Sequence, residues 1–128
     1  MAQETKHNVI IALGTNTDRE QNICYAIRQI EQMVTDITCS NKLWTKPIGL
    51  TSDKFINMLI TGNCSMDLAT LTQATKQIEH NCGRTTDDIK SGIVRLDIDI
   101  LEYDNTKLHS DDWKRDYMQV LLKDIKTI

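Results

Sequence analysis

The chain has 128 residues, 40% of them hydrophobic and 26% charged, with 15 Lys and Arg against 18 Asp and Glu. This length and composition predict one folded domain over residues 1–128 and argue against a disordered chain. The net charge of -3 and the lack of a basic run argue against a nucleic-acid partner, which needs a concentrated positive surface. No apolar stretch approaches the ~20 residues of a membrane span, so we expect a cytoplasmic protein without a membrane partner.

The four cysteines, Cys24, Cys39, Cys64 and Cys82, lie far apart in the sequence. They form no C-x-x-C pair, and no histidine lies near them at zinc spacing. This pattern favours buried thiols over a metal or redox site.

The first predicted elements are a strand and a helix. An apolar run over residues 8–13 ends at Gly14, which is typical of a buried strand. Thr17 and Glu20 have the spacing of a capping box, and apolar residues recurring at three and four predict a helix over residues 18–33.

Two strands are predicted next. β-branched and alternating apolar residues indicate a strand over residues 35–44, which the breaker Pro47 follows. Residues 55–61 predict another strand, with Phe55 and Asn57 on the face opposite to Met58.

A second helix and a final strand complete the pattern. Ser65 or Asp67 can cap the helix, Gly83 is a C-terminal stop, and residues 85–91 are loop-like. Residues 93–103 alternate between apolar and charged side chains and predict the clearest strand.

The order β-α-β-β-α-β predicts an α+β sandwich of ferredoxin-like type, with a mostly antiparallel sheet and its helices packed on one face. A further helix is expected over residues 111–125.

Asp97 and Asp99 are candidate metal ligands because they project from one side of the last strand, about 7 Å apart at the backbone. Magnesium commonly takes one or two carboxylates and completes its coordination with water and phosphate. The alternative is a solvated polar strand face.

Five motifs follow one another along the chain: I-A-L-G-T-N at 11–16, S-N-K-L-W-T-K-P-I-G at 40–49, F-I-N at 55–57, I-E-H-N-C-G-R at 78–84, and R-L-D-I-D-I-L at 95–101. In this order the chain resembles the folate-pathway pyrophosphokinases that act on 6-hydroxymethyl-7,8-dihydropterin. The resemblance implies an enzyme that moves the terminal diphosphate of ATP, its co-substrate, onto the pterin and leaves AMP.

The resemblance also implies a pterin site. Phe55 and Tyr117 would stack on the two faces of the pterin, Asn57 would bind its amide edge, and the segment with Thr45 and Pro47 would complete the recognition. From the residues alone, Phe55 and Tyr117 can equally belong to the core.

By the same resemblance, Asp97 and Asp99 would hold two magnesium ions that bridge the phosphates. The residues implied to bind the nucleotide or its phosphates, or to assist catalysis, are Glu79, Arg84, Arg95, His109 and Arg115. From the residues alone, Arg84 can be a helix-end cation, and His109 can be a solvated surface histidine.

The chain departs from the family before the D-x-D motif. The family has W-G-P-R-T where this chain has S-G-I-V-R, so Ser91 replaces an aromatic residue. Arg95 is expected on the same strand face as Asp97 and Asp99. The segment between Asp99 and His109 is also shorter than in the family.

Three functions therefore remain open from the sequence. The first is a magnesium- and ATP-dependent pyrophosphokinase of folate synthesis. The second is a non-catalytic relative that binds a pterin or a nucleotide. The third is a ferredoxin-like interaction domain on which the D-x-D motif is only surface charge. Protein partners are not indicated by the sequence.

Overall fold

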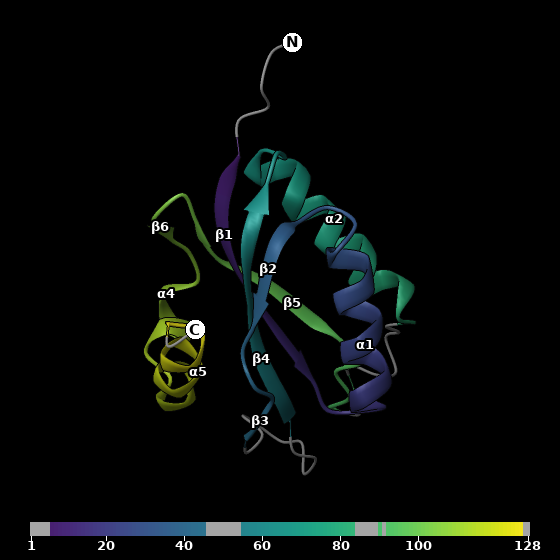
Figure 1. Ribbon diagram of the computed structural model, residues 1–128. Coiled ribbons are helices and arrows are strands. Elements are labelled where there is room, and N and C mark those ends of the chain that lie inside the picture. Colours follow the sequence, from purple (N-terminus) through teal and green to yellow (C-terminus); the bar gives the residue numbers. More distant parts are fainter. Residues whose placement is uncertain (1–5, 46–54, 84–89, 91, 127–128) are drawn as a thin grey trace.

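The computed structural model describes residues 6–45, 55–83, 90 and 92–126, so Pro47, Arg84 and Ser91 lie outside the described residues. Figure 1 shows a twisted sheet between two groups of helices. The strands are β1 (His7–Thr15), β2 (Thr35–Cys39), β3 (Leu43–Thr45), β4 (Phe55–Cys64), β5 (Asp97–Tyr103) and β6 (Thr106–Lys107). The helices are α1 (Arg19–Ile30), α2 (Leu68–Asn81), α4 (Ser110–Trp113) and α5 (Asp116–Lys126).

The sheet has the order β2-β4-β1-β5-β6, and β3 also pairs with β4. All of these pairs are antiparallel. Because β2 and β1 both run antiparallel to β4, they are parallel to each other, as a split β-α-β unit requires. The predicted ferredoxin-like α+β fold is confirmed.

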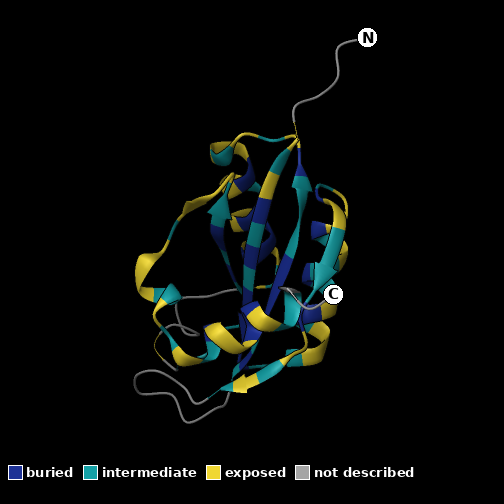
Figure 2. Cartoon of the chain, turned by 60° about the vertical axis from the view of Figure 1, so that its left-hand side comes forward, coloured by how far each residue is buried: buried dark blue, intermediate teal, exposed yellow. Residues whose placement is uncertain are grey.

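The two faces of the sheet carry different helices. α1 and α2 cover one face, as predicted, whereas α5 packs on the opposite face (Figure 1). The prediction that all helices pack on one face is therefore wrong for the C-terminal helices, which form a third layer. Figure 2 shows that buried residues are concentrated along the central strands between these layers.

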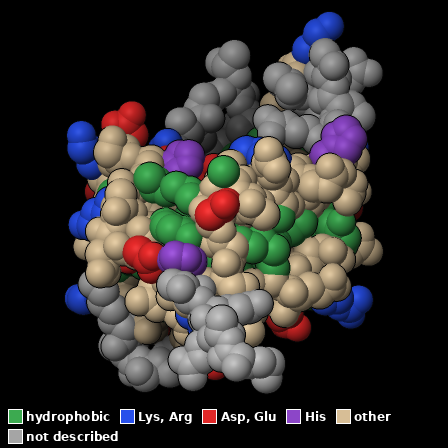
Figure 3. Space-filling model, turned by 90° about the horizontal axis from the view of Figure 1, so that it is seen from above, with side chains coloured by type: hydrophobic (Ala, Val, Ile, Leu, Met, Phe, Trp, Pro, Cys, Tyr) green, Lys and Arg blue, Asp and Glu red, His purple; other side chains and the backbone are tan. Residues whose placement is uncertain are grey.

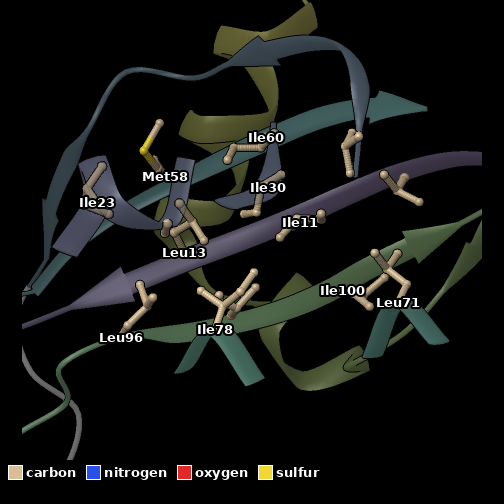
Figure 4. Packing of buried hydrophobic residues seen from close by; sticks show 14 of the residues in the cluster. Ile11, Leu13, Ile23, Ile30, Met58, Ile60, Leu71, Ile78, Leu96 and Ile100 are labelled. Carbon is tan, nitrogen blue, oxygen red and sulfur yellow. The ribbon is translucent and has the colours of Figure 1, made fainter. Parts of the chain in front are cut away.

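The larger hydrophobic cluster lies between the sheet and the helices α1 and α2 (Figure 4). Ile23 and Ile30 enter it from α1, Leu71 and Ile78 from α2, and Ile11 from β1. The side chains of this core are mainly aliphatic, since aromatic residues make up only 5% of the chain. The smaller cluster on the opposite face consists of Leu59, Leu101, Met118, Leu121 and Leu122.

The predicted capping box at α1 is wrong. The residue before the helix, Asp18, has a left-handed backbone and makes no capping side-chain bond. The Thr17 carbonyl instead accepts hydrogen bonds from the Thr15 hydroxyl at 2.9 Å and the Asn22 amide at 2.8 Å. The Asp67 cap of α2 is confirmed, because its Oδ1 accepts from the Thr70 N–H at 2.7 Å.

The single strand predicted over residues 35–44 is divided into β2 and β3. A register shift between Thr35 and Thr38 and the positive φ of Asp36 already bend β2. At Ser40 the backbone N–H still donates to the Leu59 carbonyl at 2.9 Å, but the Ser40 hydroxyl replaces a backbone carbonyl as the acceptor of the Leu59 N–H, at 2.8 Å. The bonding of β4 thus continues past the break.

The last strand begins at Asp97, four residues later than predicted. Asn16 replaces strand pairing in the preceding segment. Its Oδ1 accepts the Val94 N–H at 2.7 Å, its Nδ2 donates to the Gly92 carbonyl at 2.8 Å, and its own N–H donates to the Val94 carbonyl at 2.9 Å.

The C-terminal helix predicted over residues 111–125 is divided into α4 and α5. The Trp113 indole N–H ties α4 to the carbonyls of Leu108 at 2.9 Å and Leu101 at 3.1 Å. α5 instead packs on the sheet.

The prediction of buried thiols is met only in part. Cys64 is buried and Cys39 and Cys82 are half-buried, whereas Cys24 is exposed. Cys24 lies on the outer side of α1, because its neighbours Ile23 and Ala26 occupy the buried stripe of that helix.

The surface seen from above Figure 1 carries hydrophobic side chains in a band, with acidic and basic side chains scattered around it (Figure 3). On this face, charges of one sign do not gather among the residues drawn in colour. In the described part of the chain, no helix is long and apolar enough to cross a membrane.

We predict that Gly62→Ala destabilises the fold. A Cβ at this position would lie 2.5 Å from Val34 Cγ1 and 2.7 Å from the Thr35 carbonyl oxygen, where buried side chain and backbone leave no room. Overpacking of this kind costs about 1–3 kcal/mol of unfolding free energy, measurable by urea denaturation. Gly14→Ala is the matched comparison, since its Cβ would meet only side-chain atoms, Asn57 Oδ1 at 3.3 Å and Phe55 Cδ1 at 3.9 Å. Equal losses in the two variants would contradict this explanation.

Candidate active site

The register of three neighbouring strands brings the candidate residues together. Gly14 of β1 pairs with Asn57 of β4 on one side and with Asp97 of β5 on the other. Two residues earlier, Ala12 pairs in the same way with Leu59 and Asp99. Side chains two apart share a face, so amide and carboxylates lie on the face opposite to α1 and α2. The small residues of β1 form the floor between them.

A cavity of about 260 Å³ opens over this floor. The predicted site residues that line it are Thr45, Phe55, Asn57, Asp97, Asp99, Arg115 and Tyr117. They come from β3, β4, β5, the turn before α5 and α5 itself. The cavity therefore unites residues that the sequence places more than seventy positions apart.

One side of the cavity is formed by two aromatic side chains, Phe55 and Tyr117, and by the amide of Asn57. Phe55 is half-buried and lines the cavity, so it does not belong to the closed core. Tyr117 is also half-buried, and burial raises the pKa of its hydroxyl. The Asn57 amide nitrogen donates to the Thr45 hydroxyl, which fixes the orientation of the side chain. Asn57 Oδ1 lies on the side of Gly14, where a larger residue would press on it.

The other side of the cavity carries the carboxylates. The Asp99 side chain is 21% exposed. Burial, followed by repulsion from Asp97, raises the pKa of Asp99 to about 6. His109 Nε2 lies 3.9 Å from Asp99 Oδ1, and the His109 side chain is 48% exposed. His109 thus lies at the rim, beside Asp99, and is not itself among the residues that line the cavity.

A short hairpin brings His109 to this position. Asp104 and Asn105, both with positive φ, form the two-residue turn between β5 and β6. Turns of this kind fit the twist of a tight hairpin. The shorter segment after Asp99 thus returns the chain to the cavity rim within a few residues.

Arg115 is the cation among the described residues that line the cavity. Its Nε–H donates to Asp112 Oδ1 at 3.0 Å, and Asp112 also lines the cavity. A guanidinium held at Nε retains its two terminal NH₂ groups, which suit bidentate binding of phosphate oxygens.

Two of the implied residues lie away from this cavity. Glu79 is buried on α2, where its Oε2 accepts the Ile98 N–H at 2.6 Å. Arg95 lies before β5, with its Cδ 4.0 Å from the place of a Cβ on Gly83, at the end of α2. The expectation that Arg95 shares a strand face with Asp97 and Asp99 is not met, because alternation applies only where the strand has begun.

Sequence reasoning missed several residues that shape the cavity. Ala12 and Gly14 give it room, Met118 and Leu121 cover it from α5, and Asp112 holds the arginine. A signal for the floor was present, since the small residues Ala12 and Gly14 alternate with the large apolar residues Ile11 and Leu13 in β1. The roles of Met118, Leu121 and Asp112 depend on how α4 and α5 fold over the sheet, which spacing along the sequence does not determine.

The donor set suits a magnesium ion. Asp97 and Asp99 face one cavity, where burial and then repulsion from Asp97 raise the pKa of Asp99, and a divalent cation would relieve that repulsion. Two carboxylates are enough for magnesium when water and phosphate complete the shell. Within the described ranges, the structure forms no group of three or more His, Cys, Asp or Glu arranged to hold a metal ion.

Comparison with known proteins gives one family. The model of the 7,8-dihydro-6-hydroxymethylpterin-pyrophosphokinase (HPPK) family matches residues 10–127. The chain is 31% identical, over 96% of its length, to a mitochondrial folate synthesis bifunctional protein of Arabidopsis thaliana, and spans 24% of that protein. It shows 31% identity to a protein of the same name from Pisum sativum, and spans 26% of it. It is also 31% identical, over 79% of its length, to the 2-amino-4-hydroxy-6-hydroxymethyldihydropteridine pyrophosphokinase of Bacillus subtilis, of which it covers 62%.

We predict that Asp99→Asn stabilises the fold at neutral pH. The pKa of Asp99 is about 6 in the folded protein, above its ordinary value of 3.8. The folded state therefore binds this proton more tightly, and its stabilising effect is complete below about pH 4 and lost as the pH rises through about 6. Removing the charge should raise the free energy of unfolding by about 1–3 kcal/mol at pH 7.

The measurement is thermal unfolding from pH 4 to pH 8. The stability of Asp99→Asn should fall less over this pH range than that of the parent protein. Asp111 is an exposed residue of α4, so Asp111→Asn should show the same pH dependence as the parent protein. If the pH profile of Asp99→Asn runs parallel to that of the parent protein, the ionised carboxylate of Asp99 does not destabilise the fold and the prediction is wrong.

Proposed function

Because the chain belongs to the 7,8-dihydro-6-hydroxymethylpterin-pyrophosphokinase family, we propose that it transfers the terminal diphosphate of ATP to the hydroxymethyl group of 6-hydroxymethyl-7,8-dihydropterin. The hydroxyl oxygen forms a bond to the β-phosphorus and releases its proton to solvent, the bond from that phosphorus to the α-phosphate oxygen breaks, and AMP leaves. The observation that supports this proposal is the cavity itself. It combines an aromatic and amide wall with paired carboxylates and an arginine.

The pterin is assigned to the wall of the cavity formed by β4 and α5. Phe55 and Tyr117 offer flat surfaces to a fused ring, and such contacts favour stacking. Asn57 offers an acceptor and a donor to the amide edge, and its bond to Thr45 holds it in place before the ligand arrives. A fixed amide loses little freedom on binding, which favours selectivity for the pterin edge. On the family motif, Pro47 belongs to the same wall.

Asp97 and Asp99 are assigned as the ligands of magnesium. When bound, the metal neutralises phosphate charge and orients the polyphosphate, as metal ions do in phosphoryl transfer. Among the described residues, the cavity lining carries three carboxylates, those of Asp97, Asp99 and Asp112, and one guanidinium, that of Arg115. A bare polyphosphate would be repelled by this lining, so the proposed function requires the cation.

Arg115 is assigned to the phosphates, since Asp112 holds its Nε and leaves the terminal nitrogens for the ligand. His109 stands next to Asp99 and can donate to a phosphate oxygen from the rim. On the family motif, Arg84 is also assigned to phosphate binding and catalysis. These groups position the reactants and stabilise charge rather than form covalent bonds.

The cellular location and the domain organisation of the protein are predicted from the sequence alone. The cytoplasmic location and the single domain over residues 1–128 remain predictions. The Arabidopsis and pea relatives named above carry "mitochondrial" in their names. The chain spans about a quarter of each of those proteins, so their further activity is not assigned to it.

We predict that the protein forms AMP when incubated with 6-hydroxymethyl-7,8-dihydropterin, ATP and magnesium chloride. AMP, not ADP, is the diagnostic product, because it marks diphosphate transfer. Asp97→Asn and Asp99→Asn should each lower the rate by at least about a hundredfold, since each removes a metal ligand. Asp111→Asn, outside the cavity, should leave it unchanged.

Ligand binding without AMP formation would overturn the proposed reaction and favour a binding module. Failure to bind pterin and ATP would leave the fold with a different function. Since Asp99→Asn is expected to be more stable than the parent protein, loss of its activity cannot be ascribed to unfolding.

We predict that Phe55→Ala weakens pterin binding by about 1–2 kcal/mol, or about 5- to 30-fold in Kd, because a stacking surface is lost. Trp44→Ala is a suitable control, since this aromatic residue is exposed on the neighbouring strand β3 and does not line the cavity. Titration calorimetry measures both. Equal weakening in the two variants would contradict the assignment of Phe55 to the pterin.

A further inference from the structure

Glu79 is a buried carboxylate at an unusual place. Its side chain is 4% exposed, and burial raises its pKa. It lies on α2, outside the lining of the cavity that contains Asp97 and Asp99. A buried carboxylate is costly unless its hydrogen bonds are satisfied. The partners of Glu79 therefore indicate what it does.

The main partner of Glu79 is the backbone of β5. Glu79 Oε2 accepts the N–H of Ile98 at 2.6 Å, and Ile98 is the residue between Asp97 and Asp99. The second partner, Lys76 Nζ, lies 3.3 Å from the other carboxylate oxygen and is itself exposed. The buried hydrogen bond to Ile98 is the stronger constraint on geometry, because exposed ion pairs contribute little.

The bond matters because of where β5 lies in the sheet. Its inner edge pairs with β1 from Asp97 onward. Among the described residues, its outer edge pairs with β6 only at Glu102 and Tyr103. At Ile98 the side chain of Glu79 thus takes the place of a strand partner.

We propose that Glu79 is a positioning residue for the metal carboxylates, which it holds through the peptide N–H of Ile98; this inference rests on the proposed function. In β5, Ile98 points into the core beneath α2, while Asp97 and Asp99 point into the cavity. Fixing the peptide at Ile98 fixes the pleat, and with it the directions of both carboxylates. Glu79 acts from the opposite face of the sheet and does not touch the nucleotide.

The hydrogen bond, rather than the negative charge, is the working part of this contact. Glu79→Gln keeps an acceptor oxygen of the same reach, whereas Glu79→Ala removes it. Lys76→Ala is the matched control, since it removes only the exposed partner of the same carboxylate. All three variants are to be compared with the parent protein in the full chain.

Two readouts do not depend on catalysis. Hydrogen exchange of the Ile98 amide, measured by NMR without metal, should be at least about tenfold faster in Glu79→Ala than in Glu79→Gln and the control. Direct titration with magnesium chloride should show about tenfold weaker binding in Glu79→Ala, with Glu79→Gln recovering most of the affinity. Pterin affinity should be unchanged in all three, because the wall of β4 and α5 is not touched.

The outcomes separate the alternatives. Weaker ATP binding in Glu79→Gln and Glu79→Ala alike, with normal Ile98 exchange, would overturn the proposal and place the charge in contact with the nucleotide. Unchanged magnesium binding in Glu79→Ala would overturn it as well. If Glu79→Ala does not fold, Glu79→Gln and Lys76→Ala are compared instead. Faster exchange of the Ile98 amide in Glu79→Gln than in Lys76→Ala would overturn the proposal that an uncharged acceptor oxygen is sufficient. Failure of the parent protein to form AMP while these shifts hold would refute the proposed reaction and leave the positioning role intact.

Discussion

The pairing of β1 with both of its neighbours is the constraint on which the rest of the structure depends. It places Asn57 and Asp97 on either side of Gly14. It also directs Ile11 and Leu13 into the core on the other face. A slip of one residue in either ladder would reverse both faces at once. The same register therefore determines the hydrophobic core and the arrangement of the candidate site.

The two faces of the sheet meet opposite physical demands. The face under α1 and α2 is closed and aliphatic, and it supplies most of the buried apolar surface. The face under α5 is only partly covered, and it keeps like charges near one another at Asp97 and Asp99. Such a site opposes folding, so the closed face must supply the stability that the open face lacks.

Local patterns predicted the elements well where side chains alternate over a regular backbone. Phe55, Asn57, Asp97 and Asp99 could be placed on strand faces because β4 and β5 are regular there. The prediction for Arg95 was wrong because Asn16 holds the segment before β5 through its side chain, so strand alternation does not extend to Arg95. Long-range bonds of this kind, between residues more than seventy positions apart, leave no periodic signal in the sequence.

Glu79 has a structural role that its sequence motif does not reveal. In the fold its carboxylate lies on the opposite face of the sheet from the cavity and accepts the N–H of Ile98. Backbone groups at the edge of a sheet need partners, and the edge of β5 obtains one from a helix instead of from a strand. The demand for a hydrogen-bond partner thus connects α2 with the cavity across the sheet. A change on the closed face can therefore reach Asp97 and Asp99 without entering the cavity.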